Sequence, residues 1–249
     1  NHLSRPTVQR IAGVVMPAAG LFMRGRRVEC PVCGKRFRKF FSYGYVASRS
    51  GALCPHCMSL ERHRLLYLWL ERKTDFFSAP YRLLHIAPEV ALKRQFERHY
   101  GKEHADSYLT ADLESPLAKL HFDIQDIPLT DESVDVVICN HILEHVEDDR
   151  RALRELHRIL RKGGWGVVLV PQDLERATTF EDDSITSPEE RARVFGQYDH
   201  RRIYGRDYAE RFREAGFEVY ECDYANLIPA KEKELYALTD EPLYIVRKP

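Results

Sequence analysis

The hydrophobic positions of this 249-residue chain change their spacing repeatedly from about residue 80 onward. Short continuous apolar runs predict strands covered on both faces, and apolar residues three or four positions apart predict the helices that cover them. Predicted strands lie at 82–87, 107–111, 121–124, 134–139, 165–170, 217–222 and 243–246. Predicted helices lie at 90–100, 148–161 and 206–215. This alternation predicts an α/β fold with a doubly wound, mostly parallel sheet.

The N-terminal part of the chain carries four closely spaced cysteines. Cys30 and Cys33 form one Cys-x-x-Cys turn, and Cys54 and Cys57 form a second one after 20 intervening residues. Four thiolates at this spacing are typical of a closed tetrahedral zinc site, which has a structural role because no coordination position stays open. A redox dithiol is the alternative, but two matched pairs favour the metal.

These features divide the chain into parts. We expect an N-terminal extension at 1–23, a zinc ribbon at 24–58, a connector helix within 59–79, and a domain at 80–249 whose polar insertion 171–205 covers an acceptor as a lid. Ser59 is in position to cap the connector helix, whose apolar face would join the ribbon to the larger domain.

Charge is unevenly distributed along the chain. The 38 basic and 38 acidic residues cancel, yet Arg24 to Lys73 holds 12 basic residues against three acidic ones. Basic and aromatic residues interleave between the cysteine pairs, at 35–45. Two interpretations stay open, namely a surface that binds RNA or phosphate and a small hydrophobic core with a solvated basic edge.

Neither composition nor hydropathy predicts a membrane protein. The longest apolar candidate, 11–22, is interrupted by glycine and proline and is shorter than the roughly 20 residues that span a bilayer. We expect no membrane span and a cytoplasmic location, since clustered cysteine pairs suit a metal better than disulfides.

Polar residues follow several of the predicted strands. Pro88 and Glu89, Asp112, Asp123 and Asn140 each lie at the carboxyl end of a predicted strand or just beyond it. Ligands of doubly wound sheets bind outside these ends, so we expect the binding pocket there.

The block from Asp123 to Gly164 carries a family resemblance. Its runs Asp123-Ile124-Gln125-Asp126-Ile127-Pro128-Leu129 and Glu155-Leu156-His157-Arg158-Ile159-Leu160-Arg161-Lys162-Gly163-Gly164 resemble class I S-adenosylmethionine-dependent methyltransferases, particularly the methyltransferase-11-like branch. The likeness covers roughly residues 80 to 223 and implies a Rossmann-like sheet. The ribbon followed by Ser59-Leu60-Glu61-Arg62-His63-Arg64 resembles a bacterial subgroup with the same architecture.

The resemblance implies a set of residues that bind S-adenosylmethionine. Asp112 would accept both ribose hydroxyls, and Asp123 would accept the adenine amino group, with Ile124 beside the ring. Asn140 would border the methionine end. Outside the family pattern, Asp112 and Asp123 could instead cap their own loops.

The first strand-turn-helix departs from the family pattern. The family has an acidic residue and several glycines there, whereas this chain has His85-Ile86-Ala87-Pro88-Glu89. Ala87 and Pro88 would shape the turn, and Glu89 would meet the ammonium group of the donor. The missing glycines also leave open a degenerate fold that binds no donor.

Candidate catalytic residues come from the predicted lid and from the segment after the strand at 134–139. His200 could remove a proton from an acceptor hydroxyl while Asp199 orients its ring or Arg202 holds an anion, and His145 could line the acceptor pocket. A solvated loop with its own ion pairs explains the lid residues equally. His141 and His145 belong to a His-x-x-Glu-His pattern known from metalloproteases, an interpretation disfavoured by its position after a buried strand.

The sequence thus predicts an S-adenosylmethionine-dependent methyltransferase with a structural zinc ion. We expect an oxygen or nitrogen acceptor in a small molecule or saccharide, because the acidic domain lacks an obvious nucleic-acid track. The alternatives are an RNA methyltransferase that uses the basic ribbon and a non-catalytic, zinc-dependent binding module. The oligomeric state is left open.

Overall fold

The computed structural model describes residues 15–44 and 48–249. Most of the predicted N-terminal extension, 1–14, lies outside these residues. The strands are β1 (Arg24–Cys30), β2 (Lys35–Phe37), β3 (Phe41–Tyr43), β4 (Arg49–Leu53), β5 (Leu83–Ile86), β6 (Tyr108–Asp112), β7 (Leu120–His121), β8 (Val134–Asn140), β9 (Leu160–Leu169), β10 (Phe180–Glu181), β11 (Arg202–Ile203), β12 (Glu218–Cys222) and β13 (Leu243–Arg247). The helices are α2 (Glu61–Lys73), α3 (Val90–Tyr100), α4 (Asp149–Ile159), α5 (Pro188–Phe195), α6 (Tyr208–Glu214), α7 (Tyr224–Leu227) and α8 (Ala230–Tyr236).

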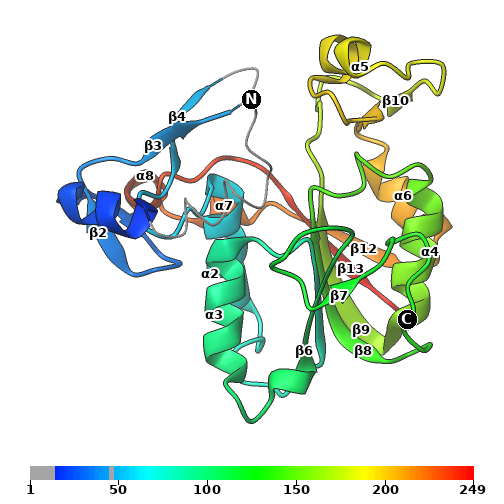
Figure 1. The fold of residues 1–249 in the computed structure, drawn as a ribbon, viewed down its shortest axis with the longest axis horizontal. Coiled ribbons are helices and arrows are strands. Elements are labelled where there is room, and N and C mark those ends of the chain that lie inside the picture. The colour runs from blue at the N-terminus through cyan, green and yellow to red at the C-terminus, as the bar shows by residue number, and fades with distance from the viewer. Residues whose placement is uncertain (1–14, 45–47) are drawn as a thin grey trace.

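A seven-stranded sheet forms the centre of the molecule, in the order β12-β13-β9-β8-β5-β6-β7 (Figure 1). The strands from β7 to β9 are parallel, and β13 runs antiparallel to both β9 and β12. The chain winds outward from β5 to β7 and then returns to place β8 on the other side of β5. The predicted α/β, Rossmann-like doubly wound fold is therefore confirmed, and its switch point lies between β5 and β8.

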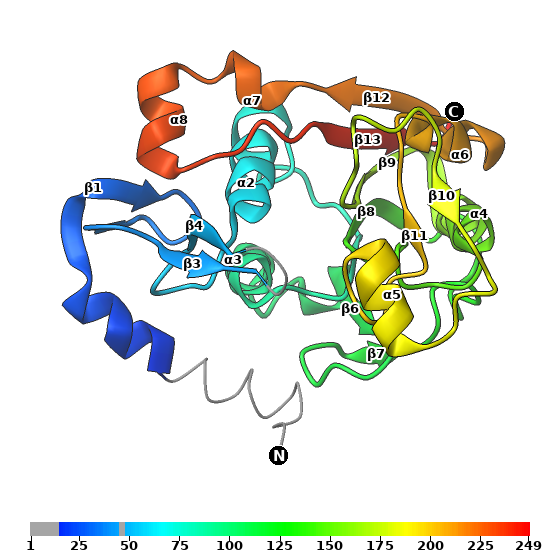
Figure 2. The same cartoon turned by 90° about the horizontal axis from the view of Figure 1, so that it is seen from above.

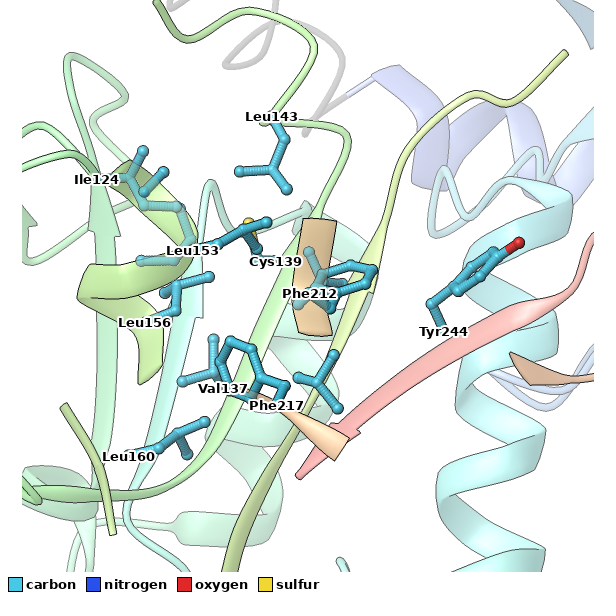
Figure 3. Close-up of a cluster of buried hydrophobic side chains, with 14 of the residues drawn as sticks. Ile124, Val137, Cys139, Leu143, Leu153, Leu156, Leu160, Phe212, Phe217 and Tyr244 are labelled. Carbon is cyan, nitrogen blue, oxygen red and sulfur yellow. The ribbon is translucent and has the colours of Figure 1, made fainter. Parts of the chain in front are cut away.

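Helices cover both faces of this sheet because its central strands are apolar on both sides. In β8, Val137 and Cys139 join the cluster under α4 and α6, whereas Val136 and Ile138 join the cluster under α2 and α3. Figure 3 shows the first cluster, in which Val137 lies among side chains from α4 and α6. This burial on both faces explains why β8 has a continuous apolar sequence.

Two predicted boundaries differ from the structure. The strand predicted at 121–124 is only Leu120–His121. The helix predicted to run through Arg161 ends at Ile159, and β9 begins at Leu160. Gly164 lies in that strand, where an added Cβ would come within 2.9 Å of the Asp135 carbonyl oxygen. This glycine thus permits close strand packing.

The predicted lid, 171–205, contains regular structure of its own. Helix α5 and the short β10–β11 pair form within it and lie beyond the upper end of the sheet (Figure 1). Helix α5 begins at the Ser187 cap, whose hydroxyl accepts from the Glu190 N–H, and ends at Gly196 with φ of 85°. Helices α7 and α8, between β12 and β13, were not predicted.

The ribbon is built from two hairpins. The hairpin β1–β2 encloses the Cys30–Cys33 turn, and the hairpin β3–β4 is followed by the Cys54–Cys57 turn. Phe37 and Phe40 are buried against the cysteines in a small separate core. For these two aromatic side chains, the small-core interpretation is the one that the structure supports. The view from above places the ribbon beside α2, α3 and α8 (Figure 2). Among the helices of the described residues, none combines the length and apolar character needed to cross a bilayer.

Candidate active site and metal centre

The four cysteines lie together at the end of the ribbon nearest α2. The Cys30 and Cys57 sulfurs are 3.6 Å apart, and the Cys33 and Cys54 sulfurs are 3.9 Å apart. Tetrahedral coordination with Zn–S bonds of about 2.3 Å requires sulfurs about 3.8 Å apart. The donor set and its spacing therefore fit one zinc ion, and they do not fit disulfides, whose sulfurs are about 2.0 Å apart.

The residues after Cys57 connect this centre to the larger domain. The Ser59 hydroxyl lies 3.1 Å from the Cys30 sulfur and 3.3 Å from the Cys57 sulfur. Ser59 was expected to cap α2, and this is wrong, because its hydroxyl faces the cysteines instead. Leu60 is the N-cap residue of α2, and its backbone N–H donates to Nδ1 of His63 at 3.2 Å.

Arg64 fastens the same helix to both neighbouring parts of the chain. Its guanidinium is fully buried and donates to the carbonyl oxygens of Ala52 and Ser59 on the ribbon side. It also donates to the carbonyl oxygens of Tyr236 and Ala237, at the end of α8. Only arginine offers five donors in a rigid planar group, so this clamp depends on the residue type.

The turn after β5 adopts a backbone conformation that normally requires glycine. Ala87 has φ of 47°, in the left-handed region, and its N–H donates to the Ala111 carbonyl oxygen on β6 at 2.7 Å. A side chain in this region costs about 1 kcal/mol relative to glycine. The turn therefore keeps its shape without the family's glycines.

Glu89, at the end of this turn, is surrounded by nitrogen donors. Its Oε2 lies 2.8 Å from His85 Nε2, and its Oε1 accepts from Asn140 Nδ2 at 3.0 Å. His63 Nε2, from α2, lies 3.3 Å from Oε1. Asn140 comes from the end of β8, so the switch point between β5 and β8 brings the carboxylate and the amide together.

The protonation states follow from burial and from these contacts. Burial alone raises the pKa of the Glu89 carboxyl, but His63 and the hydrogen bonds from His85 and Asn140 outweigh it and hold the pKa well below its usual range. Burial lowers the pKa of His63 to about 3, against the opposing effect of Glu89. Glu89 is thus an anion near neutral pH, and His63 is a neutral donor.

The buried amide of Asn140 has an oxygen without a partner. Among the described residues, no group donates to Asn140 Oδ1, although its Nδ2 is bonded to Glu89. An unpartnered acceptor next to an anionic carboxylate suits a cationic ligand with several N–H donors, such as an ammonium group. This pair fits the amino-acid end of S-adenosylmethionine.

Asp112 and Asp123 both accept hydrogen bonds from their own loops. Asp112 Oδ1 accepts from the N–H groups of Glu114 and Ser115, and Asp123 Oδ1 accepts from the Gln125 N–H. These contacts are the loop-capping role considered for both residues. Asp112 lies at the end of β6, next to β5, and its Oδ2 has no partner among the described residues.

A second cluster of titratable groups lies a few residues beyond Asn140. His145 Nδ1 lies 3.3 Å from Asp199 Oδ2, and the His145 and His200 rings meet edge to face with centroids 4.8 Å apart. Asp199 therefore contacts His145 and not the His200 ring it was expected to orient. Glu144, which is 1% exposed, completes the cluster, and its Oε2 has no partner in the described part of the chain.

The pKa shifts of the two imidazoles in this cluster have opposite directions. Burial lowers the pKa of His145, but Asp199 and Glu144 outweigh it, so the net pKa is raised. Asp199 is held at a pKa of about 2, because His145 and Gln197 overcome its burial. Burial dominates at His200 and lowers its pKa, so its imidazole is neutral at pH 7 and can accept a proton.

The lid residues reach this cluster because Arg202 is fixed to the loop after β8. Its guanidinium is 4% exposed and donates to the carbonyl oxygens of Leu143, Val146 and Glu147. Arg202 also pairs with Glu181 at 3.0 Å. The expectation that Arg202 holds an anionic acceptor is therefore wrong, since its donors are used within the protein.

The His-x-x-Glu-His segment does not have the geometry of a metalloprotease site. Residues 141–147 form turns, so His141 and His145 do not share a helical face. Ligand atoms of Glu144, His145 and His200 lie within 4.8 Å of one another. The Asp199 carboxylate, which contacts His145, compensates part of the charge of that imidazole without a metal.

Two hollows lie away from these residues. One, of about 810 Å³, is lined by Trp69, Lys73, Gly163 and Trp165, at the amino ends of the parallel strands. Ligands of doubly wound sheets bind at the opposite ends, so this hollow does not compete as the donor site. The other, of about 420 Å³, lies on the ribbon and is lined by Arg27, Arg38 and Lys39.

His63 and His85 are the residues of this site that sequence reasoning missed. His85 was quoted only as part of the first strand-turn-helix, and His63 belonged to the Ser59–Arg64 block without an assigned role. Both histidines contact Glu89, which lies four residues after His85 and 26 residues after His63. Only the fold brings the three residues together.

Comparison with known proteins agrees with this architecture. Residues 79–168, which contain β5 to the greater part of β9, match the methyltransferase-11 family, described as a methyltransferase domain. A protein of Mycolicibacterium smegmatis described as a "Probable S-adenosylmethionine-dependent methyltransferase" is 30% identical over 99 residues, covering 40% of this chain and 34% of that protein. An "Uncharacterized 37.1 kDa protein in transposon TN4556" of Streptomyces fradiae is 33% identical over 97 residues, covering 39% of this chain and 28% of that protein. This chain thus spans about a third of the length of these two relatives.

Solved structures show more distant similarity. The YcgJ protein from Bacillus subtilis has a TM-score of 0.47 at 15% identity, covering 75% of this chain and 99% of its own. The [4+2]-cyclase SpnF has a TM-score of 0.48 at 15% identity, covering 100% of this chain and 99% of its own.

Proposed function

We propose that this protein transfers a methyl group from S-adenosylmethionine to an oxygen or nitrogen atom of a small molecule or saccharide. The observation that carries the proposal is the anionic Glu89 beside the unpartnered Asn140 oxygen, at the switch point of a sheet within the matched methyltransferase segment. When bound, S-adenosylmethionine supplies an electrophilic methyl group.

On this proposal, the donor is held from both of its ends. Glu89 and Asn140 Oδ1 accept hydrogen bonds from the ammonium group, and Asp112 Oδ2 accepts hydrogen bonds from the ribose hydroxyls. Asp123 and Ile124 border the adenine, with Ile124 buried and able to cover a ring face. The backbone at Ala87 approaches the donor closely because its turn has the shape of a glycine turn.

His200 receives the proton of the acceptor on this proposal. Its neutral imidazole can take a proton as the nucleophile attacks, and His145, which contacts Asp199, lies edge to face against its ring. Burial holds the pKa of His200 below its ordinary value, so His200 returns its proton to solvent readily. The zinc ion at the four cysteines takes no part in this step, since four thiolates fill its coordination sphere.

Calorimetry with S-adenosylhomocysteine, on intact zinc-loaded protein, tests the donor site. We expect one molecule bound per chain, and Glu89→Gln should weaken binding by about 10- to 100-fold, the loss of a charge-assisted contact. Asp75→Asn, on the loop after α2, serves as a control that should bind normally. Absence of binding by the parent protein would favour the non-catalytic, zinc-dependent module instead.

RNA is a second acceptor class, favoured by the hollow on the ribbon. Arg27, Arg38 and Lys39 line it together with Phe41 and Ser42, and neither Arg27 nor Lys39 has an acidic partner among the described residues. Cations beside an aromatic ring suit a phosphodiester backbone with stacked bases.

A gel shift with single-stranded RNA at several salt concentrations tests this second class. Charge reversal at Arg27 and Lys39 should abolish a salt-sensitive shift, whereas Lys102→Glu, on an exposed turn outside the ribbon, should preserve it. A shift that survives the ribbon changes would leave the small-molecule acceptor as the proposal.

A further inference from the structure

We propose that His63 is a positioning residue for donor binding, through which the metal-bearing ribbon holds Glu89 toward the ammonium group of S-adenosylmethionine. This inference rests on the proposed function. It assigns a role to the ribbon that a purely structural zinc module would not have.

The two nitrogens of the His63 ring face different groups. Nδ1 accepts the Leu60 N–H at 3.2 Å, so in the neutral ring the hydrogen is on Nε2. Nε2 is buried and makes no aligned hydrogen bond, and it faces Glu89 Oε1 at 3.3 Å. Within the described residues, Glu89 is the only carboxylate within 4.0 Å of the His63 ring nitrogens.

The position of His63 depends on the ribbon. Ser59, four residues earlier, places its hydroxyl between two of the cysteine sulfurs, and its carbonyl oxygen accepts the Cys54 N–H at 2.9 Å. Arg64, which directly follows His63, donates to the carbonyl oxygens of Ala52 in the ribbon and of Ser59. The first turn of α2 is thus fixed on one side to the metal ligands and on the other side to Glu89.

His63 also completes the set of donors around Glu89. His85 holds Oε2, and Asn140 and His63 approach Oε1. Without the His63 N–H, Oε1 keeps one neutral donor, and the carboxylate can turn away from the ligand. The effect should be confined to the amino-acid end of the donor, because within the described residues His63 makes no hydrogen bond or ion pair with Asp112 or Asp123.

Two substitutions separate the two nitrogens of the ring. His63→Asn keeps an acceptor near the place of Nδ1 and removes the donor that faces Glu89. His63→Gln keeps a donor near the place of Nε2 and removes the acceptor for Leu60. The first variant tests positioning, and the second tests the helix start.

The assay compares two ligands by calorimetry on zinc-loaded protein. S-adenosylhomocysteine carries the ammonium group, whereas 5′-methylthioadenosine has the same nucleoside and lacks the amino-acid end. We expect His63→Asn to weaken S-adenosylhomocysteine binding about tenfold and to leave methylthioadenosine binding within twofold of the parent. His63→Gln should restore S-adenosylhomocysteine binding, with a lower melting temperature than the parent.

Other results overturn the inference. If His63→Asn binds both ligands as the parent does, His63 does not position Glu89. If it weakens both ligands equally, or if His63→Gln fails to restore binding, the residue acts only through folding. If the parent binds neither ligand, the proposed function itself fails, and this outcome is distinct from the other two.

Discussion

Replacement of Arg64 by methionine tests whether one buried side chain joins the ribbon to the rest of the protein. Methionine fills much of the same volume and removes every donor. Four carbonyl oxygens would lose the guanidinium as a donor, those of Ala52, Ser59, Tyr236 and Ala237, at donor distances of 2.7 to 3.0 Å, and of these the Ser59 oxygen keeps the Cys54 N–H.

The magnitude follows from the number and burial of these bonds. A hydrogen bond from a charged donor contributes about 1.5 to 3 kcal/mol, but the four share one guanidinium whose burial is itself costly, so their contributions do not add in full. We expect the free energy of unfolding to fall by about 4 kcal/mol. For a chain of this length, each kcal/mol lowers the melting temperature by about 2 to 4 °C, so the expected decrease is about 8 to 16 °C.

Thermal unfolding of zinc-loaded protein, followed by calorimetry with metal content measured in parallel, provides the assay. Arg38→Met is the matched control, because Arg38 is exposed and its side chain donates to one carbonyl oxygen, that of Arg24. The control should change the melting temperature by less than about 2 °C. A decrease below about 3 °C for Arg64→Met, with zinc retained, would refute the reasoning that this clamp joins the two parts.

Three further predictions concern the metal, the proton acceptor and a buried ion pair. Elemental analysis should find one zinc per chain in the parent, and Cys54→Ser should lower this value and destabilise the ribbon; unchanged content would contradict the site. Since burial lowers the pKa of His200 below its ordinary value, the methyl-transfer rate should fall as acid protonates His200, with a midpoint at a pH under 6.5. His200→Ala should remove this acid limb, and a profile that keeps it would assign the proton to another group. Arg211 donates to both Asp149 oxygens at 2.9 and 2.7 Å, and Asp149→Asn removes this buried counter-charge. We expect the free energy of unfolding, measured in urea, to fall by about 3 kcal/mol. A decrease below about 1 kcal/mol would show that Glu181 compensates.

The local signals in the sequence identified the elements of the sheet well. Helix α3 has the predicted bounds, 90–100, and β8 differs from its prediction by one residue at its end. These segments are determined by the periodicity of apolar residues, which depends only on neighbours in the chain. The Cys-x-x-Cys turns are similar, since two ligands from one turn are close together wherever the rest of the chain goes.

Residue types that suit both a local role and a long-range contact were misinterpreted. Ser59 is a residue type that caps helices, yet its hydroxyl faces the sulfur of Cys30, which lies 29 residues away in the sequence. Gly164 follows the predicted helix 148–161, yet it lies within β9, where the absence of a side chain permits the approach of β8. In each case a residue type suits two environments, and long-range packing chooses between them.

By itself, the sequence determined which segments become strands and helices, which four sulfurs are available to a metal, and which acidic residues follow the strands. The tertiary structure alone decided that Glu89 meets His63, His85 and Asn140, and that His145 pairs with Asp199. These partners are 4 to 54 residues apart, and the sign and strength of each contact depend on burial and distance, which exist only after the sheet and its covering helices have packed.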